Sequence, residues 1–338
     1  MQVGELGEFG LIERLLAQLG EAGAGIALGA GDDAAAIIPT PGMLLLATCD
    51  CQVEDRHFRR DQISPEQLGR RLAAVNLSDI AAMGGLPRWA LVSLCLPPAT
   101  QTAFVDGLYR GLAAELGSFG AQIVGGNLAA GALLTLDLTL LGEVAPAELM
   151  GRGGARVGDA VLVTGSLGSS AAGRAALEAG LTSAAAQRSV AAHLTPQPRV
   201  PAGRAIAAGG LATAMIDVSD GFAQDLGHIC DASATAAVVT AAALPITPET
   251  LAVAEALGVD PMRWALGGGE DYELILTAPE RSASDLVEVV EREAGVILTR
   301  IGTIVPPGDG RWLERVDGSR VPLTAAGWEH FAPGSERV

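Results

Sequence analysis

The sequence contains no lysine: all 22 of its basic side chains are arginines, set against 39 acidic side chains in 338 residues. This absence excludes a Walker-type phosphate loop, a Schiff base and a serine–lysine dyad, because each of these mechanisms requires a lysine amine. The net charge of −17 repels a phosphate backbone, so a nucleic-acid partner is disfavoured.

Aromatic residues and long apolar runs are also scarce. Phe, Trp and Tyr make up 4% of the chain while apolar residues reach 49%, so Ala, Leu and Val must build the core. The uncharged stretch over residues 117–136 is broken by glycines and an asparagine, and this disfavours a membrane span. The first ten residues lack the basic segment of a secretion signal. We therefore expect a globular protein without a membrane partner.

The cysteines and histidines give few signals of a metal site. The four cysteines form no C-x-x-C pair and no zinc spacing, so we expect free, mostly buried thiols and a cytoplasmic location. Three histidines (His193, His228 and His330) show no repeated spacing and are expected to be structural. His57 lies just beyond a predicted strand and is the histidine favoured for a site.

Strands alternate with helices along the whole chain, which predicts a mixed α/β class. In the first half we expect helices over residues 5–19, 65–83 and 102–116, and strands over 34–38, 43–48, 89–96, 122–124 and 133–144. In the second half we expect strands over 160–164, 214–216, 272–276 and 299–304, with helices between them. The apolar strand pattern stops at residues 145–154, which are rich in glycine. We therefore expect two domains, residues 1–148 and 149–338.

The aspartates carry the clearest chemical signal. Asp33 precedes a predicted strand, Asp50 follows one, and Asp79 lies on a helix whose neighbouring residues are almost all apolar. Asp217 and Asp220 flank Ser219 between a strand and a helix. Buried carboxylates need partners, and a chain without lysine offers few, so divalent cations are the natural remedy. An all-oxygen ligand set selects Mg²⁺, Mn²⁺ or Ca²⁺.

Plainer interpretations exist for several of these residues. Asp217 or Ser219 could cap the following helix, and Asp32 and Asp33 could be ordinary turn residues. The turn Gly165–Gly168 follows a strand and precedes a helix, so it could cradle a phosphate, although an ordinary turn is favoured. Neither an EF-hand loop nor a Gly-x-Ser-x-Gly elbow occurs, which disfavours a calcium sensor and a triad hydrolase.

Several segments occur in the order found in one family. They are GEFGLIERLL, GAGDDAAAI, the strand ending Thr48-Cys49-Asp50, VEDRHF, AVNLSDIAAMGGLP, IVGGN, DVSDGFAQDLGH and GGGEDYEL. The chain resembles the thiamine-monophosphate kinase family, of the aminoimidazole-ribonucleotide-synthetase-like superfamily, over nearly its whole length. The resemblance implies a two-domain PurM-like fold. The N-terminal domains of two subunits would pair into a shared β-barrel, and the C-terminal domain would be an α/β sandwich.

The resemblance also implies a reaction, in which the γ-phosphoryl group of ATP passes to thiamine monophosphate with the help of Mg²⁺ in a homodimer. The positions implied to bind Mg²⁺ are Asp33, Thr48, Cys49, Asp50, Asp79, Asp217 and Asp220, with Asp33, Asp79 and Asp217 taken as catalytic. The positions implied to contact ATP are Gly126, Asn127, Arg152 and Ser219. The positions implied to contact the substrate are His57, Glu270 and Trp328.

Two departures from the family pattern bear on the metal positions. Asn127 stands where the family usually has aspartate, so the position keeps a carbonyl ligand and loses a charge. Cys49 stands where threonine is common, and a thiol is a poor ligand for Mg²⁺, so only its backbone carbonyl would serve.

Three rivals can be weighed against this reading. Selenophosphate synthetases need a lysine and a reactive cysteine or selenocysteine near the N-terminus, and the related hydrogenase-maturation enzymes end in cysteine; this chain has neither feature. A non-catalytic homologue that binds a nucleotide or cation is favoured only by Asn127.

Overall fold

The structure is a computed structural model that describes residues 1–20 and 22–324. The chain forms two compact units. Of the described residues, unit 1 comprises Met1–Ile80 and Leu86–Pro146, and unit 2 comprises Ala81–Gly85 and residues 147–324. Helices and strands alternate in both units, which confirms the mixed α/β class. No helix among the described residues is long and apolar enough to cross a membrane.

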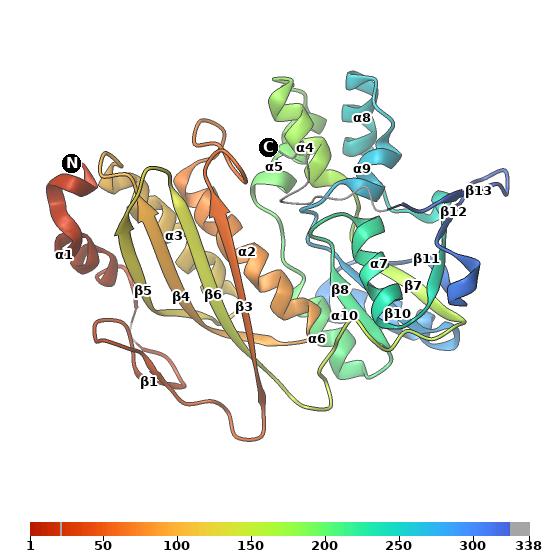
Figure 1. The fold of residues 1–338 in the computed structure, drawn as a ribbon, viewed down its shortest axis with the longest axis horizontal. Coiled ribbons are helices and arrows are strands. Elements are labelled where there is room, and N and C mark those ends of the chain that lie inside the picture. The colour runs from red at the N-terminus through yellow and green to blue at the C-terminus, as the bar shows by residue number, and fades with distance from the viewer. Residues whose placement is uncertain (21, 325–338) are drawn as a thin grey trace. The chain divides into compact units, whose positions relative to one another are not determined.

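Unit 1 is built on a four-stranded sheet with the strand order β3-β6-β4-β5, in which only β4 and β5 run parallel. Figure 1 shows helices α2 and α3 lying along one face of this sheet. The strands are β1 (Ile26–Leu28), β2 (Ala36–Ile37), β3 (Leu44–Val53), β4 (Leu86–Leu96), β5 (Gln122–Ala130) and β6 (Thr135–Val144). The helices are α1 (Val3–Leu16), α2 (Pro65–Ala82) and α3 (Thr102–Ser118).

Two glycines let α2 and α3 pack closely. A Cβ at Gly69 would lie 2.0 Å from the carbonyl oxygen of Leu108, and one at Gly111 would lie 2.0 Å from that of Glu66. Any larger residue at either position would force the helices apart. This tight layer keeps α2 fixed against the sheet, where it supplies Asp79.

The two faces of the unit 1 sheet differ in chemistry. Strand β6 turns Leu136, Leu138 and Leu140 into the core, each fully buried. The alternate positions of β3 and β4 face the other way, and there Leu45 and Leu91 are 50% and 40% exposed. Strand periodicity thus gives one face covered by helices and one open face with exposed leucines.

Unit 2 is built on a seven-stranded sheet with the order β13-β12-β9-β11-β7-β10-β8. The strands are β7 (Asp159–Thr164), β8 (Ala214–Asp217), β9 (Ala236–Thr240), β10 (Leu274–Pro279), β11 (Leu298–Val305), β12 (Trp312–Glu314) and β13 (Arg320–Pro322). The helices are α4 (Ser169–Glu178), α5 (Ala184–Leu194), α6 (Val200–Gly209), α7 (Phe222–Ala232), α8 (Pro248–Leu257), α9 (Pro261–Gly267) and α10 (Ala283–Ala294).

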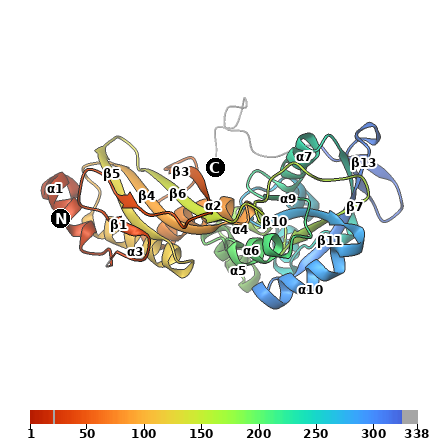
Figure 2. The ribbon, with the colours of Figure 1, turned by 90° about the horizontal axis from the view of Figure 1, so that it is seen from below.

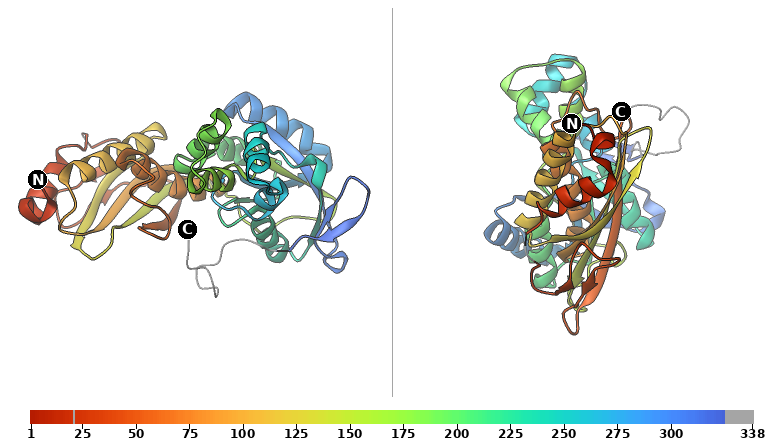
Figure 3. Two further views of the ribbon diagram at one scale, coloured as in Figure 1. Left: turned by 90° about the horizontal axis from the view of Figure 1, so that it is seen from above. Right: turned by 90° about the vertical axis from the view of Figure 1, so that its left-hand side faces the viewer.

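Helices cover both faces of this larger sheet. Figure 2 shows α7 on one side and α6 with α10 on the other. Phe222 and Leu226 of α7 are fully buried and join Val161, Val163 and Ile216 of the sheet in one apolar core. Helices α4, α5 and α8 pack into a second, smaller cluster, visible in Figure 3 as the neighbouring green and cyan helices. The core places the ends of β7, β8 and β10 on a rigid support.

The predicted ends of two strands need correction. Strand β3 runs to Val53, so Asp50 lies inside it rather than after it. Strand β5 continues past its predicted end at residue 124 to Ala130, so Gly126 and Asn127 lie inside the strand. Gly126 is needed there because a Cβ would lie 2.1 Å from the carbonyl oxygen of Val92 on the neighbouring strand.

The prediction of mostly buried thiols is wrong. Only Cys230 is buried, while Cys49 and Cys51 are exposed and Cys95 is half-buried. The physical reason is strand alternation, since the odd-numbered residues of β3 point to the open face of the sheet.

Candidate active site

Strand β3 and helix α2 bring three of the predicted metal positions together in unit 1. The Thr48 hydroxyl donates a short hydrogen bond to the Asp79 carboxylate. The Asp50 backbone N–H donates to Oδ1 of Asn76 at 3.1 Å. Thr48 and Asp50 share the covered face of β3 because they are two residues apart, and Asn76 and Asp79 are neighbours one helical turn apart. The result is a cluster of oxygen atoms between the strand and the helix.

Asp79 differs from the rest of its helix. Residues 71–78 and residue 80 are all buried, whereas Asp79 is only partly buried. Its apolar surroundings are therefore as predicted, but its own side chain reaches solvent. Asn76, fully buried, is held by a second hydrogen bond from Nδ2 to the carbonyl oxygen of Leu72 at 3.0 Å. The cluster is thus fixed by Asn76 and open at Asp79.

Other predicted positions of unit 1 lie apart from this cluster. The Cys49 side chain points to the open face, with Sγ 3.5 Å from the Asp137 carboxylate. Asp33 lies in an exposed turn where its N–H bonds Oδ1 of Asp32 at 2.8 Å. Gly126 and Asn127 are exposed on β5, at the opposite edge of the sheet from β3. Three strand spacings, roughly 14 Å, separate the two edges.

His57 is held in the turn that ends β3. Asp55 there has a left-handed φ of 60°, and the Val53 N–H donates to Nδ1 of His57 at 3.0 Å. Nδ1 is therefore an acceptor, and the neutral ring carries its proton on Nε2. Glu54 fixes the same turn by accepting from the Leu134 N–H at 3.1 Å. The imidazole is thus oriented by its own strand end.

In unit 2, the turn after β8 wraps around a carboxylate. Asp217 ends the strand and is buried, and Asp225 of α7 accepts from the N–H groups of Ser219, Asp220 and Gly221 at 3.1, 3.2 and 3.1 Å. Burial, with the charge of Asp220, raises the pKa of Asp225 to about 7 against the effect of these bonds. Helix α7 has Gly221 as its N-cap residue without a side-chain cap, so neither Asp217 nor Ser219 acts as the cap.

Asp220, Asp225 and His228 are the one group of its kind in the described part of the chain. They offer ligand atoms that all lie within 4.8 Å of one another. Asp33, Asp50 and Asp79 do not form such a group among the described residues. The sequence predicts Asp220 as a metal position and His228 as structural, because the three-residue helical spacing from Asp225 to His228 carries no signal of its own.

The turn between β7 and α4 is filled by carboxylates of the chain itself. Asp271 accepts from the N–H groups of Gly168 and Ser170 at 2.6 and 2.9 Å, and Glu273 accepts from Ser166 at 3.3 Å. Burial raises the pKa of Asp271 to about 7, and the two amide hydrogen bonds oppose this shift. The amides that a phosphate would use are therefore engaged, which supports the ordinary-turn interpretation.

Glu270 lies in a strained loop before β10. Glu270 and Tyr272 have left-handed φ values of 67° and 52°, which costs about 1–3 kcal/mol for each residue. The Glu270 N–H bonds the Ser219 carbonyl oxygen at 2.8 Å, which joins this loop to the turn after β8. The Glu270 carboxylate lies 3.8 Å from Nδ1 of His193, a buried residue that sequence reasoning had taken as structural.

The two remaining predicted positions differ in how far the structure describes them. Arg152 is exposed and its guanidinium forms no ion pair with any residue that the structure describes. Trp328 lies outside the described residues. Asp271 and Glu273 were not predicted from the sequence. The pattern that could have indicated them is three acidic residues within four positions, directly after three glycines.

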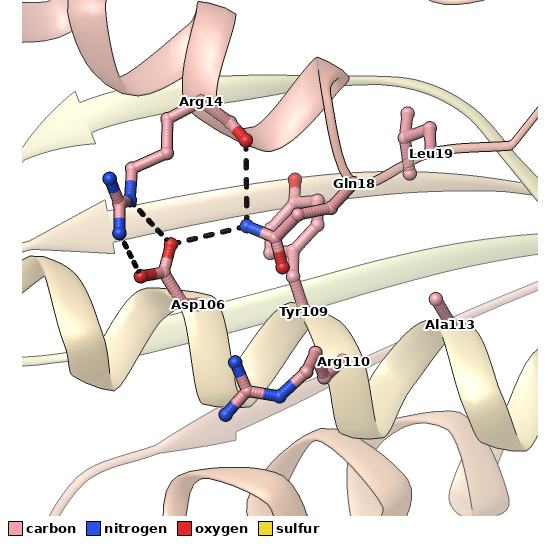
Figure 4. A pocket seen from close by; sticks show the side chains of 7 residues that line it. All are labelled: Arg14, Gln18, Leu19, Asp106, Tyr109, Arg110 and Ala113. Atoms are coloured by element: carbon pink, nitrogen blue, oxygen red, sulfur yellow. Dashed lines mark hydrogen bonds and ion pairs between the residues drawn. The ribbon is translucent and has the colours of Figure 1, made fainter.

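A pocket elsewhere in unit 1 contains none of these residues. It has a volume of about 460 Å³ and lies between α1 and α3, lined by Arg14, Gln18, Leu19, Asp106, Tyr109, Arg110 and Ala113. Figure 4 shows Asp106 beside Arg14 at one end of the pocket, where it accepts hydrogen bonds from both Arg14 and Gln18. Arg14 and Gln18 already bond the Asp106 carboxylate, so this pocket is not assigned a metal-binding or phosphate-binding role.

Comparison with known families covers most of the chain. The family described as AIR synthase related protein, N-terminal domain, matches residues 31–144, and the corresponding C-terminal domain matches residues 156–312. The thiamine-monophosphate kinase of Escherichia coli strain K12 is 38% identical over 333 residues, 96% of this chain and 98% of that protein. That of Mycobacterium tuberculosis strain H37Rv is 41% identical over 272 residues, 80% of each chain.

Solved structures give the same result. The thiamine-monophosphate kinase from Stenotrophomonas maltophilia K279a is 33% identical, with a TM-score of 0.79 over 92% of this chain and 95% of that one. A structure described as AaThiL complexed with AMPPCP and TMP is 32% identical, with a TM-score of 0.77 over 98% and 99%. The hydrogenase maturation protein HypE of E. coli has a TM-score of 0.78 at 20% identity over 97% and 99%, which shows a shared fold alone.

Proposed function

Because the chain belongs to the thiamine-monophosphate kinase family, we propose that it transfers the γ-phosphoryl group of ATP to thiamine monophosphate, forming thiamine diphosphate and ADP. The observation that carries this proposal is the 38% identity to a kinase of that name over 96% of the chain. The Thr48–Asp79 cluster and the Asp217–Gly221 turn supply the oxygen-rich chemistry that such a transfer needs.

The residues present fit Mg²⁺ as the resident metal. Thr48, Asp50 and Asp79 in unit 1 and Asp217 and Asp220 in unit 2 offer hard oxygen donors, the kind that Mg²⁺ prefers. A carboxylate in solvent contact on an otherwise buried helix is the clearest sign of this fit, because packing does not require it. When bound, Mg²⁺ neutralises phosphate charge and aligns donor and acceptor.

The chain's own groups then bind and orient the two phosphate compounds. The acceptor phosphate already carries a nucleophilic oxygen, so no general base is needed. We propose that Gly126, Asn127, Arg152 and Ser219 contact ATP, with the exposed Arg152 guanidinium supplying positive charge in place of lysine. Asp33 completes the carboxylate set. His57, Glu270 and Trp328 are proposed to contact thiamine monophosphate.

The direct test is incubation of the protein with ATP, Mg²⁺ and thiamine monophosphate, followed by chromatography of the products. Stoichiometric thiamine diphosphate and ADP are expected. ADP with inorganic phosphate, or no ADP at all, would support the non-catalytic homologue instead. Unphosphorylated thiamine serves as the matched control acceptor.

We also propose a cytoplasmic homodimer in which residues 1–148 supply the ATP, Mg²⁺ and pairing functions and residues 149–338 complete the site. The exposed Leu45 and Leu91 on the open sheet face support pairing, because a second copy laid on this face would remove their apolar surface from water. In this arrangement two such faces would meet as a shared β-barrel.

Light scattering at micromolar concentration is expected to give twice the chain mass of 34.3 kDa. Leu91→Asp should shift the mass toward the monomer, because it places a charge among apolar contacts. Ile297→Asp, at a 69% exposed residue of unit 2, is the control and should leave the dimer intact. A stable wild-type monomer would contradict the proposal.

Asn127 is expected to weaken one Mg²⁺ position without abolishing activity. An asparagine oxygen still binds a hard cation, but the position has lost one unit of negative charge. Asn127→Asp should therefore lower the Mg²⁺ concentration at half-maximal rate in a titration at fixed ATP. An unchanged or higher Mg²⁺ requirement would mean that the site has been rebuilt around asparagine.

A further inference from the structure

The segment Glu270–Glu273 connects two turns of unit 2 through separate groups. On one side, Asp271 holds the N–H groups of Gly168 and Ser170 at the start of α4. On the other side, the backbone N–H groups of Glu270 and Tyr272 bond the carbonyl oxygens of Ser219 and Val218 at 2.8 and 2.9 Å. The loop before β10 therefore has an anchor at each turn.

Glycines make both approaches possible. A Cβ at Gly165 would lie 2.0 Å from Oε1 of Glu273, and a Cβ at Gly269 would lie 2.4 Å from the carbonyl oxygen of Ser219. A residue with any side chain at either position would push the loop away from its anchor. Glycine at positions 165 and 269 therefore allows the segment Glu270–Glu273 to approach both turns closely.

The backbone conformation of the segment Glu270–Glu273 depends on contacts with the residues around it. Glu270 and Tyr272 occupy the left-handed region, which non-glycine residues adopt only when surrounding contacts enforce it. Asp271 lies between them, and its carboxylate makes two short hydrogen bonds to backbone that belongs to another element. These bonds fix the residue between the two strained ones and act together with the backbone bonds of Glu270 and Tyr272 to Ser219 and Val218.

The geometry points to Asp271 as a positioning residue, which fixes the strained backbone of Glu270 and so holds the Glu270 carboxylate toward the thiamine monophosphate site. This inference rests on the proposed function, in which Glu270 contacts the substrate. Asp271 acts through Glu270 and is itself turned toward α4. The Glu270 carboxylate near His193 is consistent with a single imposed orientation.

The inference predicts different effects on the binding of thiamine monophosphate and of ATP. The turn after β8, which carries Ser219, is held independently by the three N–H bonds to Asp225. Loosening the Glu270 loop should therefore leave the ATP contacts largely in place. The expected signature is a change in the KM for thiamine monophosphate with little change in the KM for ATP.

The kinetic test compares Asp271→Ala, Asp271→Asn and the control Asp260→Ala. Asp260 is exposed and bonds the Met262 N–H at 2.9 Å at the start of α9, so the control also removes an aspartate from a helix start. Asp271→Ala should raise the KM for thiamine monophosphate roughly tenfold, since small misplacements of a substrate contact are costly. Asp271→Asn should be intermediate because its carbonyl keeps one acceptor oxygen. The KM for ATP should stay within about twofold in all three.

Hydrogen exchange supplies a readout that does not depend on turnover. In Asp271→Ala the amides of residues 267–272 should exchange faster, while those of β10 (Leu274–Pro279) keep their protection. Faster exchange throughout unit 2, with both KM values rising together, would mean a merely structural role and overturn the inference. Unchanged exchange in residues 267–272 would also overturn it.

These outcomes are distinct from a failure of the proposed function. If the wild-type protein formed no thiamine diphosphate, the proposed reaction would fail, while the exchange comparison would still decide whether Asp271 holds the loop. If the wild type is active and Asp271→Ala keeps a wild-type KM for thiamine monophosphate, the positioning role alone is rejected.

Discussion

Asp79→Asn is expected to lower the rate of phosphoryl transfer by at least roughly a hundredfold while the protein stays folded. The asparagine retains an oxygen that accepts the Thr48 hydroxyl, and residues 71–78 do not depend on the Asp79 charge for their packing. What the variant loses is one unit of negative charge at a proposed Mg²⁺ position. The melting temperature of the metal-free protein should hold, because the amide keeps the size of the carboxylate and its contact with Thr48.

The measurement is the initial rate at saturating Mg²⁺ and ATP, together with a thermal melt. Asp61→Asn is the control, because Asp61 is an aspartate of the same unit that is 66% exposed and paired only on the surface with Arg59. A near wild-type rate for Asp79→Asn at saturating Mg²⁺ would contradict a metal-bridging role. A large drop in the melting temperature of Asp79→Asn would indicate a structural role instead.

Arg199→Ala is expected to lower the free energy of unfolding by about 3–5 kcal/mol, because it leaves a buried charge without its partner. The Arg199 guanidinium makes two bonds of 2.7 and 2.6 Å to Glu273, whose side chain is 4% exposed. Glu273 also accepts from the buried Thr164 hydroxyl at 2.7 Å. Removal of the arginine would therefore leave the buried Glu273 carboxylate without its cationic partner.

The matched comparison is Arg188→Ala, which breaks the exposed pair with Glu249. Here the side chains are 64% and 26% exposed, against 24% and 4% for Arg199 and Glu273. Surface pairs contribute at most about 1 kcal/mol, so the control should move little in urea titration. Equal losses in the two variants would show that burial does not set the value of the Arg199 pair.

The parts of the fold that follow a local period could be predicted from the sequence. Helices α2 and α3 lie within a few residues of their predicted ranges, because apolar residues at helical spacing mark them. Short strands without a long apolar pattern, such as β9 and β12, were not anticipated. The end of β3 was misplaced because Asp50 and Cys51 interrupt the apolar run while the backbone pairing with β6 continues.

Candidate site residues could be predicted from the sequence where one side chain differs in chemistry from its neighbours. Asp79 could be found from its apolar neighbours alone, and Asp217 and Asp220 from their place between a strand and a helix. Asp271 could not be assigned in this way, because its partners are backbone N–H groups about one hundred residues away in the chain. Nothing in a local sequence pattern specifies which buried amides a carboxylate will meet.

The open face of the unit 1 sheet has a consequence for oxidative damage. Cys51 is exposed there, yet partial burial and the nearby charges of Asp137 and Asp50 raise the pKa of its thiol. Peroxides attack the thiolate form of cysteine, so a thiol whose pKa is raised by partial burial and by nearby carboxylates should react slowly in spite of its exposure. The partial burial and the carboxylates around this thiol are therefore expected to slow its oxidation to sulfenic acid.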